Sequence, residues 1–281
     1  HRSIREKIFK LSYKGYKYLA NKFVRNNDAF IINPYLPFKE EIKLELALHQ
    51  FPQLWRKIKP EIQIKSDHFL RKNLTEQLTQ EKGNNVENIL RSLLFELIPL
   101  FYLEGFSELK KISSQQPWPN SPKFIYTANN FNTDDVFKLW AAIKIENGSK
   151  YYIGQHGNSY YTLRNFFPRV EEKTSDKFFT WGWENNDSKF KPAFIFNTAG
   201  KKEKKYNKQG ELLLIEKQFI SKFTWDTYAE YENYFKSQKK FVERLQTKIT
   251  KKMTIKLHPR FHYKVFDEQS RWKEFNPKLN I

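Results

Sequence analysis

The chain has 281 residues, enough for one large domain or two small ones with a substantial core. It carries 50 Lys and Arg against 31 Asp and Glu, and this net charge of +19 favours polyanionic partners: nucleic acid, an anionic bilayer surface or acidic sugars. The absence of cysteine excludes disulfides, thiolate chemistry and cysteine-based zinc sites. No apolar run approaches the roughly 20 residues needed to cross a bilayer.

Residues 1–120 are expected to be a mostly helical N-terminal portion. Helical spacing links Ile4, Ile8 and Leu11, and the Asn33–Pro37 stretch is expected to be a turn or extended link. The clearest helix is predicted from about Asn85 to Leu100, where apolar residues recur at helical spacing and form one stripe: Val86, Ile89, Leu90, Leu93, Leu94 and Leu97.

Residues 121–206 have the pattern of a Rossmann-like unit. Strands are predicted at 123–127, 151–154, 176–182 and 191–197. Between the first two, Asn132 or Thr133 is expected to cap a helix whose apolar face includes Val136 and Trp140. The alternation of strand, helix and strand predicts a parallel sheet.

Residues 207–281 are expected to begin a second α/β unit. The charged run Lys201–Lys205, most simply a solvated loop, separates it from the first, with contact to anionic lipid as a second interpretation. A strand at 211–215, a long charged helix at 225–252 and a strand ending at His258 follow. The fold class is therefore predicted as α/β with two Rossmann-like units, the second of which looks incomplete.

The acidic pair Asp134-Asp135 has two interpretations. Carboxylates in the first turn of a helix complement its dipole and accept hydrogen bonds from its free N–H groups. Alternatively, a carboxylate held at the carboxyl end of a strand can serve as base or nucleophile towards a sugar. The two roles are compatible because a capping position is rigid.

Gln155-His156-Gly157 directly follows a predicted strand. In open α/β sheets ligands bind beyond the carboxyl ends of the strands, so a histidine there is expected to face a cleft. An exposed loop histidine and a buried structural histidine are the competing interpretations. The flanking glycines and small polar residues favour a functional one.

His258-Pro259-Arg260 also follows a predicted strand. Imidazolium and guanidinium groups are good donors to phosphate oxygens, and the proline stiffens the turn. No pair of histidines has a helical metal spacing with a nearby carboxylate, so no metal and no cofactor are predicted.

Several segments together resemble a family of transferases from O-antigen and other surface-polysaccharide gene clusters. They are Asn33–Pro37, Tyr102–Phe106, Tyr126–Phe131, Asp134–Ala142, Gly154–Gly157 and Thr180–Trp183, in an order that spans nearly the whole chain. That family is similar to bacterial retaining β-Kdo transferases of the GT-B type, which use CMP-Kdo. A His-Pro dipeptide that contacts the CMP phosphate is shared by several CMP-sugar transferases.

The resemblance implies that His258 and Pro259 hold the nucleotide and that the Asp134/Asp135 region supplies the carboxylate for a double displacement. With the strand-end pattern added, the expected site is as follows: Asp134, Asp135 and His156 are catalytic; Gln155, Gly157, His258, Pro259 and Arg260 bind the donor; Asn130, Lys138, Tyr160 and Tyr161 contact the acceptor or sugar. Two departures stand out. Tyr161 replaces an expected small residue, and a Ser/Thr-rich nucleotide-binding turn after the His-Pro strand is not found before Ile281.

The sequence is thus interpreted as that of a cytoplasmic glycosyltransferase. A second form of this interpretation places it as a peripheral protein at the inner face of a bacterial inner membrane. Its expected partners are a CMP-activated acidic sugar, Kdo-like, and an anionic glycan or glycolipid acceptor. Another nucleotide-sugar transferase, of the CMP-sialic-acid type, is the second interpretation. A basic nucleic-acid-binding protein is the third, and the lack of an RRM, KH, OB or helix-turn-helix signature counts against it.

Overall fold

The computed structural model divides the chain into two compact units, His1–Lys201 and Lys202–Ile281. Each is described by itself. The residues that it describes are 13, 15–60, 63–80, 83–157, 160, 169–203, 210–217, 225–258 and 267–281, without the side chains of 225–228. The boundary lies a few residues before the expected one, inside the charged run that begins at Lys201.

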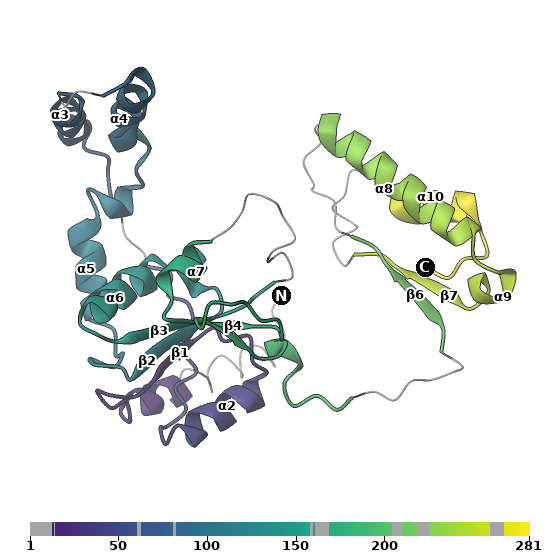
Figure 1. Cartoon of the computed structure of the whole chain (residues 1–281), viewed down its shortest axis with the longest axis horizontal. Helices are drawn as coiled ribbons and strands as arrows, with labels where there is room; N and C mark the ends of the chain where they lie inside the picture. The colour runs from purple at the N-terminus through teal and green to yellow at the C-terminus, as the bar shows by residue number, and fades with distance from the viewer. Residues whose placement is uncertain are drawn as a thin grey trace. The chain divides into compact units, whose positions relative to one another are not determined.

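The first unit is built on a five-stranded sheet in the order β1-β2-β3-β4-β5, and every neighbouring pair is parallel (Figure 1). Its strands are β1 (Phe30–Ile32), β2 (Phe124–Thr127), β3 (Lys150–Gly154), β4 (Lys177–Thr180) and β5 (Phe190–Pro192). A mixed α/β unit with such a sheet is of the Rossmann-like kind, as the sequence predicts.

Alternate residues of these strands face opposite sides of the sheet. On one side, Phe30, Ile125, Ile153 and Phe178 enter the core together with residues of α6 (Asp135–Glu146). The rings of Phe30 and Trp140 lie 4.4 Å apart between centroids. Burying large side chains like these stabilises the fold by about 1.5–3 kcal/mol each. The core therefore fixes α6, and with it the loop that joins β2 to α6.

Other helices complete the first unit. They are α2 (Phe38–Ala47), α3 (His68–Thr79), α4 (Asn85–Leu97), α5 (Phe106–Ser114) and α7 (Val170–Thr174), with short 3₁₀ turns η1 (Leu100–Tyr102), η2 (Asn130–Asn132) and η3 (Phe196–Thr198). α5 packs beside α6, whereas α3 and α4 form a hairpin at the far end of α5 (Figure 1).

Within the first unit, the structure differs from the sequence expectations in the following ways. The segment before residue 120 supplies β1, so it is not a helical portion separate from the sheet. Asp134, and not Asn132 or Thr133, caps α6, because its side chain accepts the N–H of Phe137. Of the strand predicted at 191–197, only 191 and 192 pair with β4, and the chain then turns into η3.

The second unit contains a parallel pair of strands, β6 (Leu212–Ile215) and β7 (Met253–Lys256). Its helices are α8 (Trp225–Glu243), α9 (Thr247–Thr250) and α10 (Glu268–Phe275), so the long helix expected at 225–252 ends at Glu243. Tyr231, Ile255 and Trp272 are fully buried and form its own small core.

Candidate active site

The loops that follow β2, β3 and β4 meet at one edge of the parallel sheet. β2 ends at Thr127, β3 at Gly154 and β4 at Thr180. The Gln-His-Gly segment directly follows β3, and the Asp-Asp pair follows β2 after the short turn η2. This carboxyl edge is where ligands bind in open α/β sheets. Parallel pairing therefore brings the Asp-Asp and Gln-His-Gly segments to the same edge.

Asp134 is fully buried, and its carboxylate accepts three hydrogen bonds. Oδ1 accepts the N–H of Phe137 at 3.0 Å, and Oδ2 accepts the N–H of Ile58 at 3.2 Å and the Nδ2 amide of Asn130 at 2.9 Å. Asn130 is itself buried. These contacts join the β2–α6 loop to the segment after Trp55, which is the geometry of a structural cap.

Asp135 differs from its neighbour because its side chain is 29% exposed. Oδ1 accepts a hydrogen bond of 2.6 Å from the Tyr102 hydroxyl and lies 2.6 Å from Lys138 Nζ. Burial alone would raise the pKa of Asp135, but the contacts with Lys138 and Tyr102 outweigh it and hold this pKa below its usual range. Asp135 is thus an ionised, accessible carboxylate at the edge of the sheet.

Gln155 is almost completely buried, although it was assigned to the donor. Its Oε1 accepts the N–H of Trp181 at 2.9 Å and the indole N–H of Trp183 at 2.7 Å, while its Nε2 donates to the carbonyl oxygen of Gly157 at 2.7 Å. Gln155 therefore ties the loop after β3 to the loop after β4.

His156 is half-buried and belongs to a chain of polar contacts. The Tyr160 hydroxyl lies 3.0 Å from His156 Nδ1 and donates to Glu171 Oε1 at 2.9 Å. The His156 ring also lies against the backbone of Ala128 and has an edge contact with the ring of Phe131. The ring therefore joins the loop after β3 to the loop after β2.

Burial has the largest effect on the pKa values of the residues in this series of polar contacts. It lowers the pKa of His156, and Arg169 lowers it further. Glu171 and the contact with the Ala128 backbone raise this pKa, but they do not outweigh burial. The pKa of Tyr160 is raised by burial and by Glu171. Neutral imidazole and neutral phenol are therefore the favoured forms near pH 7.

Other assigned residues are not brought together here. Gly157 makes no close packing contact at its Cα, because a Cβ atom added there would have nothing within 4 Å. His258 is half-buried after β7 in the second unit, whose placement relative to the first is not determined. Tyr161, Pro259 and Arg260 lie outside the described residues.

Two polar residues that contact the expected site residues at this edge were not predicted from the sequence. Tyr102 comes from η1, and Glu171 comes from α7. Tyr102 lies within a segment that carries the family resemblance, which was the available signal. Glu171 stands in an acidic helix start with no such signal.

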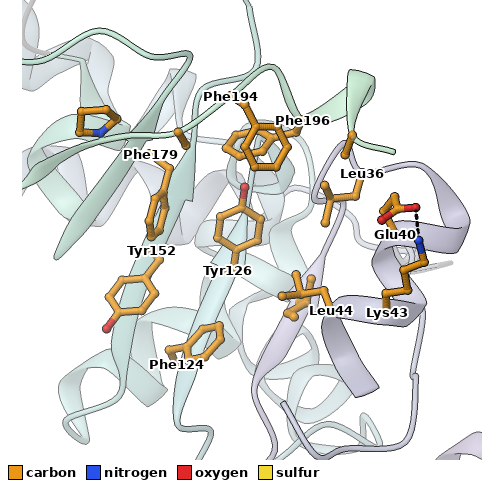
Figure 2. A pocket seen from close by; sticks show the side chains of 14 residues that line it. Leu36, Glu40, Lys43, Leu44, Phe124, Tyr126, Tyr152, Phe179, Phe194 and Phe196 are labelled. Carbon is orange, nitrogen blue, oxygen red and sulfur yellow. Dashed lines mark hydrogen bonds and ion pairs between the residues drawn. The ribbon is translucent and has the colours of Figure 1, made fainter. Parts of the chain in front are cut away.

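A groove with a cavity volume of about 730 Å³ lies on the α2 side of the sheet, opposite α6 (Figure 2). Its aromatic lining comes mainly from alternate strand residues: Phe124, Tyr126, Tyr152 and Phe179, with Phe194 and Phe196 beyond β5. Burial raises the pKa of Tyr126, for whose hydroxyl no hydrogen bond is found among the described residues. A Cβ atom on Gly154 would lie 2.3 Å from that hydroxyl oxygen.

The described part of the chain has neither a metal-binding cluster nor a membrane-spanning helix. No cluster of three or more His, Cys, Asp or Glu side chains there has the arrangement of a metal site. Within the same residues, no helix is both long enough and apolar enough to pass through a membrane.

The five-stranded parallel sheet and its flanking helices define an α/β protein of the Rossmann-like class. A family model described as LIC12162 family transferase matches residues 1–281, so the chain belongs to this family, whose name indicates a transferase. Comparison with curated proteins finds no match, and comparison with solved structures finds none.

Proposed function

We propose that this transferase moves an acidic, Kdo-like sugar from a CMP-activated donor to a surface polysaccharide or a lipid-linked glycan. The proposal extends to a GT-B arrangement of the two α/β units and to work at the cytoplasmic face of a membrane. The family resemblance supports it, and so does the net charge of +19, because the donor, the glycan and the membrane surface are all anionic.

The observation that carries the proposal is the partly exposed, ionised carboxylate of Asp135 at the carboxyl edge of the sheet. A double displacement needs a carboxylate that is charged and reachable. Asp134 is not reachable, because it is fully buried and its carboxylate accepts three hydrogen bonds from the protein. We therefore assign the nucleophile to Asp135 and the capping role to Asp134.

In the first step, an Asp135 oxygen forms a bond to the anomeric carbon while the bond to the CMP phosphate oxygen breaks. CMP leaves with that electron pair, and the sugar is held as a glycosyl ester. In the second step, an acceptor hydroxyl attacks the same carbon, the ester bond breaks and the carboxylate is regenerated. Two inversions at one carbon retain the anomeric configuration.

The hydroxyl proton of the acceptor must pass to a base, and His156 is our candidate. Its lowered pKa leaves the ring neutral near pH 7. Both ring contacts, with Tyr160 and with the Ala128 backbone, are made in this structure. The acceptor hydroxyl must therefore replace one of them. Contact with Tyr160 and Glu171 would then stabilise the imidazolium that forms.

The test of this step is mass spectrometry of the intact protein after incubation with CMP-Kdo. We expect an adduct of one sugar on the wild type or on a slowed variant such as His156→Ala, and none on Asp135→Asn. An adduct on Asp135→Asn that maps to another residue would remove Asp135 from the nucleophile role. Inversion of the anomeric centre in the product would exclude double displacement altogether.

Donor binding is assigned to the second unit through His258. If the imidazole donates to the CMP phosphate, His258→Ala should weaken CMP binding by about 1.5–3 kcal/mol, the range for a hydrogen bond to a charged group. Calorimetry measures this directly. Unchanged CMP affinity in a folded variant would remove His258 from the donor site.

The positive charge also allows the rival interpretation of nucleic-acid binding. Oligonucleotide binding depends on release of counterions and falls steeply with salt. We expect CMP to bind with little dependence on salt and a random oligonucleotide to bind weakly at 150 mM salt, a concentration of roughly physiological ionic strength. Tight oligonucleotide binding without CMP binding would favour the rival.

A further inference from the structure

Helix α4 exposes an entire stripe of large aliphatic side chains. Its six members are between 45% and 72% exposed: Val86, Ile89, Leu90, Leu93, Leu94 and Leu97. None of the residues of α4 is buried in the structure. Scattered exposed apolar residues are normal, but a contiguous set rimmed by polar residues marks an interaction surface.

The helix that carries the stripe is rigidly built. Asn84 and Glu87 form a capping box at its start, with hydrogen bonds of 2.9 and 3.0 Å. α3 packs along α4, and Arg71 of α3 donates to the carbonyl oxygen of Ile98 just beyond the end of α4 (Figure 1). The stripe is thus presented on a formed helix and does not have to fold on binding.

The spacing within the stripe is that of a helix-pairing seam. Val86, Leu90, Leu93 and Leu97 follow one another at intervals of four, three and four residues, the pattern of alternating d and a positions in a heptad repeat. Ile89 and Leu94 flank this line on either side. A helix with such a seam is suited to a second helix of the same kind.

The charges around the stripe argue against an anionic occupant. Between Asn85 and Leu97 the helix has two glutamates and one arginine and no lysine, in a chain whose net charge is +19. A helix that lies on a membrane surface is usually rich in Lys and Arg on its polar face. Neither a bilayer nor an acidic glycan fits this rim, whereas another apolar helix does.

We propose that α4 is a dimerisation surface on which it pairs, antiparallel, with α4 of a second copy of this chain. The stripe offers an apolar area on the order of 500 Å² per copy, so the pair would bury roughly 1,000 Å², near the lower limit of a specific interface. Phe69 on α3 is 75% exposed and can add to this area. The two hairpins would form a four-helix arrangement.

The register follows from the seam. With the two-fold axis between Leu90 and Leu93, Leu90 meets the partner's Leu93 and Val86 meets the partner's Leu97. Antiparallel pairing also sets the opposite ends of the two helix dipoles side by side, which parallel pairing would not. Twofold symmetric dimers are the commonest protein assemblies.

The first experiment is light scattering of the whole chain over a range of concentrations. We expect the mass to rise from 34.1 kDa to twice this value. The double variant Leu90→Glu with Leu93→Glu should stay monomeric at every concentration. The matched control is Ser92→Glu, which places a charge on α4 beside the stripe and should leave dimerisation unchanged.

The second experiment maps the register by disulfide formation, which is clean because the chain has no cysteine. Variants that each carry a single cysteine are mixed in pairs and oxidised. Leu90→Cys should cross-link with Leu93→Cys, and Val86→Cys with Leu97→Cys, whereas each variant alone should give little product. Ser92→Cys is the control and should give none.

Several results would overturn the proposal. A wild-type chain that remains monomeric at about 100 µM would show that something other than a second copy covers the stripe. A dimer that persists in the double glutamate variant, with helix content preserved by circular dichroism, would place the interface elsewhere. Efficient cross-linking of each cysteine variant with itself would contradict antiparallel pairing.

Discussion

Tyr102 donates a hydrogen bond of 2.6 Å to the same carboxylate oxygen of Asp135 that Lys138 approaches. The two donors come from different parts of the chain: Tyr102 precedes the whole β2–α6 unit, and Lys138 lies one turn further along α6. Together they keep the carboxylate charged while it remains partly exposed. This pairing distinguishes Asp135 from Asp134 and leads to the first prediction.

Asp135→Asn is expected to be stable and nearly inactive, because a carboxamide does not readily form or release a glycosyl ester. In Tyr102→Phe the carboxylate loses a hydrogen-bond donor, so the pKa of Asp135 should rise. The acid limb of the pH–rate profile should therefore move to higher pH. The pH profile of the transfer rate measures this shift. Wild-type turnover by Asp135→Asn would reduce Asp135 to a surface residue.

Asp134 is the matched comparison. Asp134→Ala should destabilise the fold by about 0.5–2 kcal/mol, as loss of a helix cap does. Asp134→Asn should be milder, since one side-chain oxygen still accepts the N–H of Phe137. Urea denaturation gives both values. A stable but inactive Asp134→Asn would exchange the roles that we assign to the two aspartates.

Gln155→Ala is expected to destabilise the first unit by about 1–3 kcal/mol, because the part-buried N–H groups of Trp181 and Trp183 lose their acceptor. Tryptophan fluorescence should report the change in the loop after β4. Gln115→Ala at the exposed end of α5 is the control and should be neutral. If Gln155→Ala keeps full stability yet loses CMP affinity, the donor-binding assignment stands instead.

Gly154→Ala is expected to cost about 1–3 kcal/mol through overpacking, since its Cβ would lie 2.3 Å from the Tyr126 hydroxyl and 2.7 Å from Phe196 Cε2. Tyr126→Phe removes the nearer of these atoms, so the double variant should recover part of the loss. Gly157→Ala is the control, because nothing lies within 4 Å of its added Cβ. Equal melting temperatures for Gly154→Ala and Gly157→Ala would contradict this packing.

His156 should make stability depend on pH. Its pKa is lowered in the folded state, so the unfolded chain binds the proton more readily as pH falls below about 6.5. The stability that it contributes is complete above that pH and is lost on acidification. We expect the melting temperature to drop less between pH 7.5 and 5.5 in His156→Gln than in the wild type, relative to a His68→Gln control. If the melting temperature falls equally with pH in all three proteins, the His156 ring is solvated in the folded state and makes no such contribution.

The Arg71–Glu104 pair should hold the α3–α4 hairpin. Two hydrogen bonds from Arg71, of 2.6 and 2.7 Å, lower the pKa of Glu104 to about 2. The contribution of ionised Glu104 to the stability of the hairpin is therefore present above about pH 4.5 and is lost as pH falls towards 2. In Glu104→Gln, amide exchange over residues 68–97 should speed up at neutral pH. Glu76→Gln, from an exposed pair on the same helix, should leave exchange unchanged, and equal rates in the two variants would refute the anchoring role.

Much of the α/β pattern could be predicted from local sequence. The strands β2, β3 and β4 and the helix α6 lie where apolar runs and helical spacing predict them, because those patterns arise from burial of one face. β1 was not predicted. Its three residues are too short to show a period, and only pairing with β2 makes them a strand.

At the candidate site, the sequence by itself determined which residue types would stand at the ends of β2 and β3, since chain order and parallel pairing carry both segments to one edge. Only the tertiary structure decided which of two adjacent aspartates is buried and which is partly exposed. Their environments are set by Ile58, Tyr102 and Lys138, two of them distant in sequence. Long-range packing governs solvation and hydrogen bonding, and no local pattern encodes it.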